Sequence, residues 1–291
     1  MQYKIFDAHC DTALKIYSHN KSLLKNSFNV SIDKLSNYKK ATYTMAVFND
    51  GTLKMDDVFA IIKKIKNEKI NNPDIKIIFA IEGLGNTLDF EICHLEGLKN
   101  EGVKFISLTH NDDNFLCGGI KNNKIGLTDF GKETLKKMAD FDFVLDLSHI
   151  SDAGFFEAEA FYKKRICATH SNSRIICHHN RNLTDEMFLK IKERNGVCGI
   201  NLYPVFLADT YLEKETTSFD AIRHIEHFLS LGGENNIGIG ADFDGIDLYP
   251  MDIKNSADLY ILFDNMLKLN YSEDIINKIS YQNYENMLNF E

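Results

Sequence analysis

Short runs of apolar and β-branched residues recur along this chain, and a segment with helical periodicity follows most of them. Eight such runs predict eight strands, over 3–9, 43–48, 75–81, 103–108, 143–148, 165–169, 196–202 and 236–241. The clearest helical segments between them cover 56–70, 130–141, 151–164, 184–194 and 218–232. This alternation predicts parallel strands that are joined by right-handed crossovers.

Eight repeats favour a closed (β/α)8 barrel of the TIM type over an open doubly wound sheet. An open dinucleotide-binding sheet would carry GxGxxG after its first strand, whereas the nearest match, at 83–85, follows the third strand and has Leu88 in place of the last glycine. Further helices are expected after the eighth strand, over 256–270 and 284–288, where they would close one end of the barrel. The long connection over 12–42 is expected to form a lid or a subunit contact.

Composition and charge narrow the classes of function. The chain has 291 residues, of which 44% are hydrophobic and 26% charged, and we predict one barrel domain over 1–291 because such barrels commonly take about 250 residues. Forty-two acidic against 33 basic residues give a net charge of −9, which argues against a nucleic-acid partner.

No apolar run is long enough for a membrane anchor or a signal core, so a cytoplasmic location is expected. The six cysteines form no CxxC pair and are expected to be reduced.

Residues with metal-binding or acid–base side chains stand where six of the eight predicted strands end. They are His9 and Asp11 after the first strand, Glu82 after the third, His110 after the fourth, His149 after the fifth, His170 after the sixth and Asp242 after the eighth. In a parallel barrel all of these converge on the carboxyl-terminal face, where barrel enzymes place their active sites. Any one histidine would more often be a hydrogen-bonded structural residue, but recurrence at six strand ends favours a metal site.

The number and type of these residues predict two metal ions. His9 and Asp11 are two residues apart, so an extended chain would place both side chains on one face and Cys10 on the other. Imidazole and carboxylate ligands suit zinc or a similar divalent metal, and there are more of them than one open catalytic ion requires. Glu82 is the natural bridging carboxylate. The remaining histidines of interest are interpreted as structural or solvated: His178, His179, His224 and His227.

Seven segments, in order from the first strand to the eighth, resemble the membrane dipeptidases of peptidase family M19. They are FDAHCDT (6–12), IEG (81–83), SLTHN (107–111), LDLSH (145–149), THSNSR (169–174), NRN (180–182) and GADFDG (240–245). A single HxD motif is weak, but seven motifs in this order and spacing are specific. The resemblance implies a metal-dependent hydrolase barrel of the amidohydrolase-like kind that cleaves free dipeptides.

The resemblance also implies the ligands of two Zn²⁺ ions per chain, although other divalent metals fit the same residues. The two sets are His9, Asp11 and Glu82 for one ion, and Glu82, His149 and His170 for the other. His110 would then polarise the substrate carbonyl and stabilise the oxyanion. Arg181 would bind the substrate carboxylate. Asp242 would lie beside a metal-bridging hydroxide and act first as general base and then as general acid.

Several properties of the family extend the expectation beyond these residues. A bacterial-type member without a membrane anchor is implied, and a homodimer is expected. Members often accept a D-residue at the C-terminal position and some open β-lactam rings, but the sequence alone assigns neither property to this chain. Two alternatives stay open: another binuclear amidohydrolase that acts on an N-acyl amino acid or a cyclic amide, and a non-catalytic barrel that uses its mouth to bind a ligand.

Overall fold

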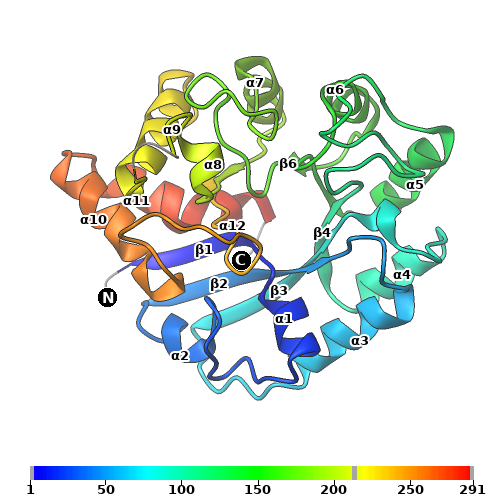
Figure 1. The fold of residues 1–291 in the computed structure, drawn as a ribbon, viewed down its shortest axis with the longest axis horizontal. Coiled ribbons are helices and arrows are strands. Elements are labelled where there is room, and N and C mark those ends of the chain that lie inside the picture. The colour runs from blue at the N-terminus through cyan, green and yellow to red at the C-terminus, as the bar shows by residue number, and fades with distance from the viewer. Residues whose placement is uncertain (1–2, 212–214, 289–291) are drawn as a thin grey trace.

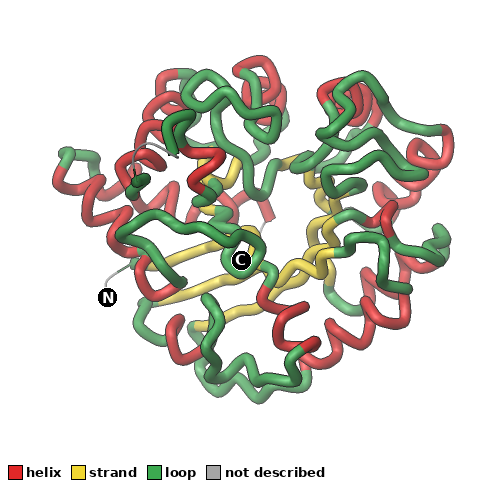
Figure 2. Tube along the Cα trace, in the orientation of Figure 1, coloured by secondary structure: helices red, strands yellow, loops and turns green. Residues whose placement is uncertain are grey.

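Eight parallel strands form one sheet that curls into a barrel, as predicted. The structure is a computed structural model that describes residues 3–211 and 215–288. The strand order is β6-β5-β4-β3-β2-β1-β8-β7, and the isolated parallel bridge between Ala168 and Cys198 joins the two ends of this series. Figure 1 shows the helices around the ring of strands, and Figure 2 shows the strands inside the helical layer.

The strands differ in length between the two halves of the barrel. They are β1 (Lys4–Cys10), β2 (Lys40–Phe48), β3 (Ile75–Glu82), β4 (Val103–Ser107), β5 (Val144–Asp146), β6 (Ile166–Cys167), β7 (Cys198–Ile200) and β8 (Ile237–Ile239). The last four strands are shorter than the sequence pattern predicts. Where they end, side chains rather than backbone carbonyls of the neighbouring strand accept hydrogen bonds from backbone amides. Asp146 Oδ1, for example, accepts hydrogen bonds from the backbone amides of Ser148 and Thr169. The chain is thus free to turn at the ends that carry polar residues.

The helices follow the strands in the expected alternation. They are α1 (Thr12–Ser18), α2 (Ile32–Leu35), α3 (Met55–Lys66), α4 (His94–Asn100), α5 (Asp129–Asp140), α6 (Asp152–Phe161), α7 (Asp185–Glu193), α8 (Pro204–Leu207), α9 (Ser218–Ser230), α10 (Tyr260–Lys268), α11 (Glu273–Asn277) and α12 (Asn283–Leu288), with short turns η1 (Leu84–Asn86), η2 (Ser256–Asp258) and η3 (Lys278–Gln282). Some of the helices begin at capping residues: Ser151 and Thr184, for example, accept hydrogen bonds from the third amide of α6 and α7. Such caps satisfy amides that have no partner within the helix.

The C-terminal segment closes the amino-terminal end of the barrel, as the sequence predicts for an added helix. Tyr284 of α12 is fully buried, and its ring stacks on Phe6 with a centroid distance of 5.1 Å. Its hydroxyl donates to the carbonyl of Thr169 at 3.3 Å, so the side chain extends through the barrel interior. A Cβ on Gly238 would lie 2.3 Å from this ring, so glycine is required at that position of β8. The side chain of Tyr284 therefore fills the barrel interior from the amino-terminal end of the strands.

Three long segments surround that open end. Residues 11–39 connect β1 to β2 and contain α1 and α2, residues 108–128 lie between β4 and α5, and residues 240–259 lie between β8 and α10. In the described part of the chain, no helix has the length and apolar character that crossing a membrane requires.

Candidate metal centre

The five predicted metal ligands come together at the open end of the barrel. They are all buried: His9, Asp11, Glu82, His149 and His170. Their ligand atoms form two triads that share Glu82, and within each triad the atoms lie within 4.8 Å of one another. Asp146 joins His9 and His170 in a third such group, although three hydrogen bonds from Ser148 and Thr169 already occupy its carboxylate. The five predicted ligands are the side chains that the sequence places at the strand ends, and the structure brings them together as candidates to hold metal ions.

The two carboxylate oxygens of Glu82 face different ligands. Oε1 lies 2.9 Å from Nε2 of His149 and 3.4 Å from Nε2 of His170. Oε2 lies 3.4 Å from Nε2 of His9, on the other side of the carboxylate. One carboxylate with an oxygen directed to each of two ligand sets has the form of a bridge between two ions.

Asp11 reaches the site by a different route from the one the sequence suggested. The expectation of an extended chain through Asp11 was wrong, because β1 ends at Cys10 and Asp11 has φ −95° and ψ 16° at the start of α1. Its amide donates to the carbonyl of Phe243 at 2.9 Å, which holds this turn against the β8 loop. Asp11 Oδ2 nevertheless lies 3.6 Å from Nε2 of His9, so the pair still faces one point.

Hydrogen bonds at Nδ1 fix the orientation of two of the rings. Asn111 Oδ1 lies 2.9 Å from Nδ1 of His149. Thr169 Oγ1 donates to Asp146 Oδ2 at 2.5 Å and therefore accepts from Nδ1 of His170, at 2.8 Å. Both contacts place the proton on Nδ1 and leave the lone pair on Nε2, which is the tautomer that a metal ligand requires. These three supporting residues lie in the segments 107–111, 145–149 and 169–174 that resemble the family, but only the folded barrel shows that they contact the rings.

The electrostatics of the cluster fit a cation. Burial lowers the pKa of His149 and of His170 well below the ordinary value, so both rings are neutral near pH 7. Burial alone would raise the pKa of Glu82, but His9 holds it well below the ordinary value, and the carboxylate is charged. Burial would lower the pKa of His9, but Glu82 and Asp11 hold it well above the ordinary value, so these two carboxylates favour a positive charge between them. Nε2 of His9 and Oδ1 of Asp11 are buried without a hydrogen-bond partner in the part of the chain that the structure describes. Buried polar atoms usually have a partner, and a metal ion bound by these two atoms would supply the one that they lack.

A cavity of about 400 Å³ opens beside this cluster. Its lining combines metal-facing residues with an apolar wall: Asp11, Leu14, Lys15, Phe48, Glu82, His110, Asn111, His149, Tyr203, Phe206, Asp242, Asp244, Gly245 and Ile246. The cavity has the size of a small-molecule site and places any occupant against the cluster.

His110 lies in this cavity as the sequence analysis anticipated. Its ring contacts those of Phe48 and His149, with centroid distances of 4.3 and 4.4 Å. Nδ2 of Asn111 lies 3.4 Å from Nε2 of His110, while Oδ1 of the same amide faces His149. Burial lowers the pKa of His110, so its ring is neutral and carries one N–H near pH 7. The amide of Asn111 places that proton on Nδ1.

Asp242 also lines the cavity, on the loop after β8. It adopts a left-handed backbone with φ 63°, which is uncommon for a residue with a side chain. A Cβ on Gly245 would lie 2.1 Å from Asp11 Oδ2 and 2.3 Å from Asp242 Oδ1, so glycine lets the two carboxylates meet. Burial raises the pKa of Asp242 to about 8, while His9 opposes this effect and Asp11 adds to it. Asn201 Nδ2 donates to Asp242 Oδ2 at 2.9 Å.

Arg181 is buried close to the cluster, with 4% of its surface exposed. Its guanidinium donates to Ser171 Oγ and to the carbonyl of His170, both at 3.1 Å, and it lies 5.7 Å from the ring centre of Phe206. Arg181 is thus held inside the fold and is not an exposed partner of the acidic residues Asp185 and Glu186 of α7. Nε has no partner in the described part of the chain. Arg181 stands behind Phe206, which lines the cavity, rather than in the lining itself.

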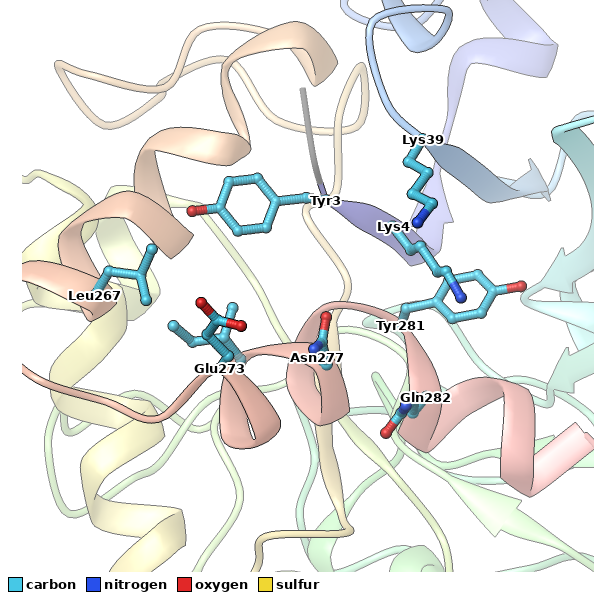
Figure 3. A pocket seen from close by; sticks show the side chains of 9 residues that line it. Tyr3, Lys4, Lys39, Leu267, Glu273, Asn277, Tyr281 and Gln282 are labelled. Carbon is cyan, nitrogen blue, oxygen red and sulfur yellow. The ribbon is translucent and has the colours of Figure 1, made fainter.

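A second cavity, of about 310 Å³, lies at the opposite end of the barrel, beside the start of β1. Figure 3 shows its lining, which comes from β1, the residue before β2 and the segment from α10 to η3: Tyr3, Lys4, Lys39, Leu267, Glu273, Ile276, Asn277, Tyr281 and Gln282. None of the predicted site residues is among them. The predicted residues Asp11, Glu82, His110, His149 and Asp242 instead line the cavity at the carboxyl ends of the strands.

A barrel with buried histidines and carboxylates at the carboxyl ends of its strands is the arrangement expected of a metal-dependent enzyme. The model of the family "Membrane dipeptidase (Peptidase family M19)" matches residues 40–289. The chain belongs to this family of metallopeptidases.

Known proteins agree with this assignment. The chain is 28% identical over 246 residues to an uncharacterized protein in the pqqA 5′ region of Klebsiella pneumoniae, which covers 82% of this chain and 89% of that protein. It is 31% identical over 192 residues to an uncharacterized dipeptidase of Schizosaccharomyces pombe, covering 64% of this chain but only 45% of the yeast protein. The fold matches that of a metallopeptidase from Rhodobacter sphaeroides, liganded with a phosphinate mimic of L-Ala-D-Ala, with a TM-score of 0.84, 19% identity and 99% coverage of each chain.

Proposed function

We propose that this protein is a zinc-dependent dipeptidase that hydrolyses the peptide bond of free dipeptides at a site for two ions. The observation that carries the proposal is that the two oxygens of the Glu82 carboxylate face different ligands. Oε1 is directed to His149 and His170, and Oε2 is directed to His9. The Rhodobacter metallopeptidase with its L-Ala-D-Ala mimic supports dipeptides with a D-residue at the C-terminal position as one class of substrate.

The residues present fit two zinc ions with imidazole and carboxylate ligands. His9, Asp11 and Glu82 would hold one ion, and Glu82, His149 and His170 the other. When bound, such a pair supplies Lewis acidity toward the carbonyl and makes water acidic enough to attack near neutral pH. The side chains around the cluster then decide what is bound and where protons move.

Asp242 would accept the proton of the attacking water and return it to the leaving amine. Its carboxylate faces Asp11 across Gly245 and lines the cavity, so it lies where substrate and cluster meet. The hydrogen bond from Asn201 holds Oδ2 and leaves Oδ1 to handle the proton. A carboxyl whose pKa is raised by burial is suited to alternate between base and acid near neutral pH.

His110 would donate a hydrogen bond to the carbonyl oxygen as negative charge develops on it. The ring is neutral, its single proton lies on Nδ1, and it stacks beside His149 at the wall of the cavity. A preorganised donor at this position stabilises the oxyanion more than the uncharged carbonyl.

Arg181 would supply the positive charge that attracts the free carboxylate of a dipeptide. Two of its donors hold the guanidinium in place, and the unpartnered Nε–H remains for a ligand. Phe206 lines the cavity, and its ring centre lies 5.7 Å from the guanidinium of Arg181, which is not in the lining, so direct contact with a substrate would need a rearrangement at this point. A fixed cation close to the scissile bond accepts only substrates that end one residue beyond it.

Hydrolysis of a defined panel by zinc-loaded protein tests the proposal. The panel contains free L,L- and L,D-dipeptides, the same dipeptides with amidated C-termini, and the corresponding tripeptides, with amine release as the measurement. Zinc-dependent cleavage confined to the free dipeptides is expected. If every peptide remains intact while two ions are bound, the proposal fails and hydrolysis of an N-acyl amino acid or a cyclic amide becomes the better assignment.

A further inference from the structure

Lys15 is the one lysine or arginine among the described side chains that line the cavity beside the metal cluster. It stands on α1, four residues beyond Asp11, so that the same turn that delivers a metal ligand also delivers this ammonium group. Its side chain is 40% exposed, which leaves it accessible to a bound molecule. Neither the proposed ligand sets nor the proton transfer uses it.

The nearest carboxylate to Lys15 already has other partners. Asp244 accepts a hydrogen bond from Thr12 Oγ1 at 2.5 Å and from the amide of Asn29 at 3.1 and 3.2 Å, and its side chain is 1% exposed. Nζ of Lys15 lies 3.4 Å from Asp244 Oδ1, which is long for a charge-assisted hydrogen bond. Asp244 thus steadies the ammonium at the cavity edge without occupying all three of its N–H donors.

The other acidic residues of the lining are directed elsewhere. Asp11 and Glu82 face His9, and Asp242 is held by Asn201. Besides these polar residues the lining contains apolar side chains, among them Leu14, Phe48 and Ile246. An apolar wall with one cation at its edge fits a short aliphatic side chain that ends in a carboxylate.

Position in the barrel indicates which residue of a dipeptide would meet Lys15. Arg181 follows β6, whereas Lys15 and its neighbour Asp244 follow β1 and β8. In Figure 1, α1 and β6 lie on opposite sides of the ring of strands. A dipeptide with its free carboxylate toward Arg181 therefore directs its N-terminal residue toward Lys15. This step rests on the dipeptidase function proposed above.

We propose that Lys15 selects dipeptides with an acidic N-terminal residue, aspartate or glutamate, by pairing its ammonium group with the side-chain carboxylate. The methylene groups of that residue would pack on Leu14 and Phe48. Lys15 is thus a specificity residue of the peptidase, and the substrate class is L-Asp-Xaa and L-Glu-Xaa.

The comparison of Glu-Ala with Gln-Ala tests this directly, because the two dipeptides have nearly the same shape and differ in charge. The zinc-loaded wild-type protein should show a kcat/KM about fivefold higher for Glu-Ala, the range expected of a partly exposed ion pair. Raising the salt concentration should reduce this ratio, since such pairs are screened. In Lys15→Gln the ratio should fall to about one, and in Lys15→Glu it should fall below one while Lys-Ala improves.

Lys21→Gln is the matched control, because Lys21 is exposed on the connection after α1 and does not line the cavity. It should keep the wild-type ratio. Equal kcat/KM for Glu-Ala and Gln-Ala in the wild type, or an unchanged ratio in Lys15→Gln, would overturn the role of Lys15 while leaving the dipeptidase function intact. Failure to cleave any dipeptide would instead overturn the proposed function on which this inference rests.

Discussion

The Nε2 atoms of His149 and His170 face each other at 2.8 Å, and Glu82 Oε1 lies 2.9 Å from the first of them. Each ring carries its proton on Nδ1, so two nitrogen lone pairs and a carboxylate oxygen point to one place. Acceptors that meet in a buried site repel one another unless a cation lies among them. A zinc ion bound by Glu82, His149 and His170 would relieve this repulsion.

Asn111 should contribute to zinc affinity without touching the metal. Asn111→Leu removes the acceptor at Nδ1 of His149, so the ring loses its fixed orientation, and zinc affinity should fall by about 10- to 100-fold. Asn111→Asp keeps an acceptor at the same place and should restore most of the affinity. Competition against a zinc chelator measures both. Equal affinity of Asn111→Leu and wild type would contradict this role.

Glu82→Gln should lower the metal content from two ions per chain to one or fewer. The amide nitrogen cannot replace a carboxylate oxygen as a ligand, so one triad loses a ligand and the bridge is broken. Metal analysis after dialysis provides the measurement, and the exposed Glu186→Gln serves as the control that should keep two ions. A stoichiometry of two in Glu82→Gln would show that Glu82 does not bridge.

Arg181 should distinguish free from amidated dipeptides. In the wild type, amidation removes the carboxylate charge and should raise KM at least tenfold, since a buried guanidinium attracts an anion strongly. Arg181→Lys keeps the charge but loses the Nε–H and the planar guanidinium, so KM for free dipeptides should rise while that for amidated ones changes little. Steady-state kinetics on matched substrate pairs gives the answer. A wild-type enzyme indifferent to amidation would remove Arg181 from substrate binding.

His224 should make the folded state sensitive to acid. The ring is fully buried on α9, accepts from the amide of Ser173 and faces the carbonyl of Leu207, and burial lowers its pKa from 6.5 to about 4. Below pH 6.5 the unfolded chain therefore binds a proton that the folded chain does not bind until about pH 4. The free energy of unfolding should fall through this interval by up to about 3 kcal/mol from this residue.

Urea unfolding of wild type and His224→Gln at pH 7 and pH 4 isolates this contribution. Glutamine can accept from Ser173 and donate to Leu207 but does not titrate, so the variant should lose less stability between the two pH values. His178→Gln, at an exposed position, should behave as the wild type does. The same loss in all three proteins would refute the assignment to His224.

The sequence predicted the barrel and its ligand residues because both depend on local pattern. Apolar runs mark strands, and in a parallel barrel the residue after each strand must lie at one face, so His149 and His170 could be placed together without coordinates. The eight-stranded barrel and the family membership are confirmed. The roles of the site residues, the single-domain extent, the homodimer and the cytoplasmic location stay predictions.

Other features could not be read from the sequence because they depend on contacts between distant segments. Asn111 meets His149 across 38 positions, and Thr169 connects His170 to Asp146 across the end of β5. The entry of Tyr284 into the barrel interior depends on glycines that leave space in β7 and β8. Lys15 lay in the long connection predicted over 12–42, and only the formation of α1 places it at the cavity.

Zinc titration of the metal-stripped protein, with hydrolysis of a free dipeptide followed at each addition, tests the proposed two-ion dipeptidase most directly. Activity should rise until two equivalents of zinc per chain are bound and then level off, because Glu82 must hold both ions for the site to be complete. Full activity at one equivalent, or no hydrolysis at any zinc content, would contradict it.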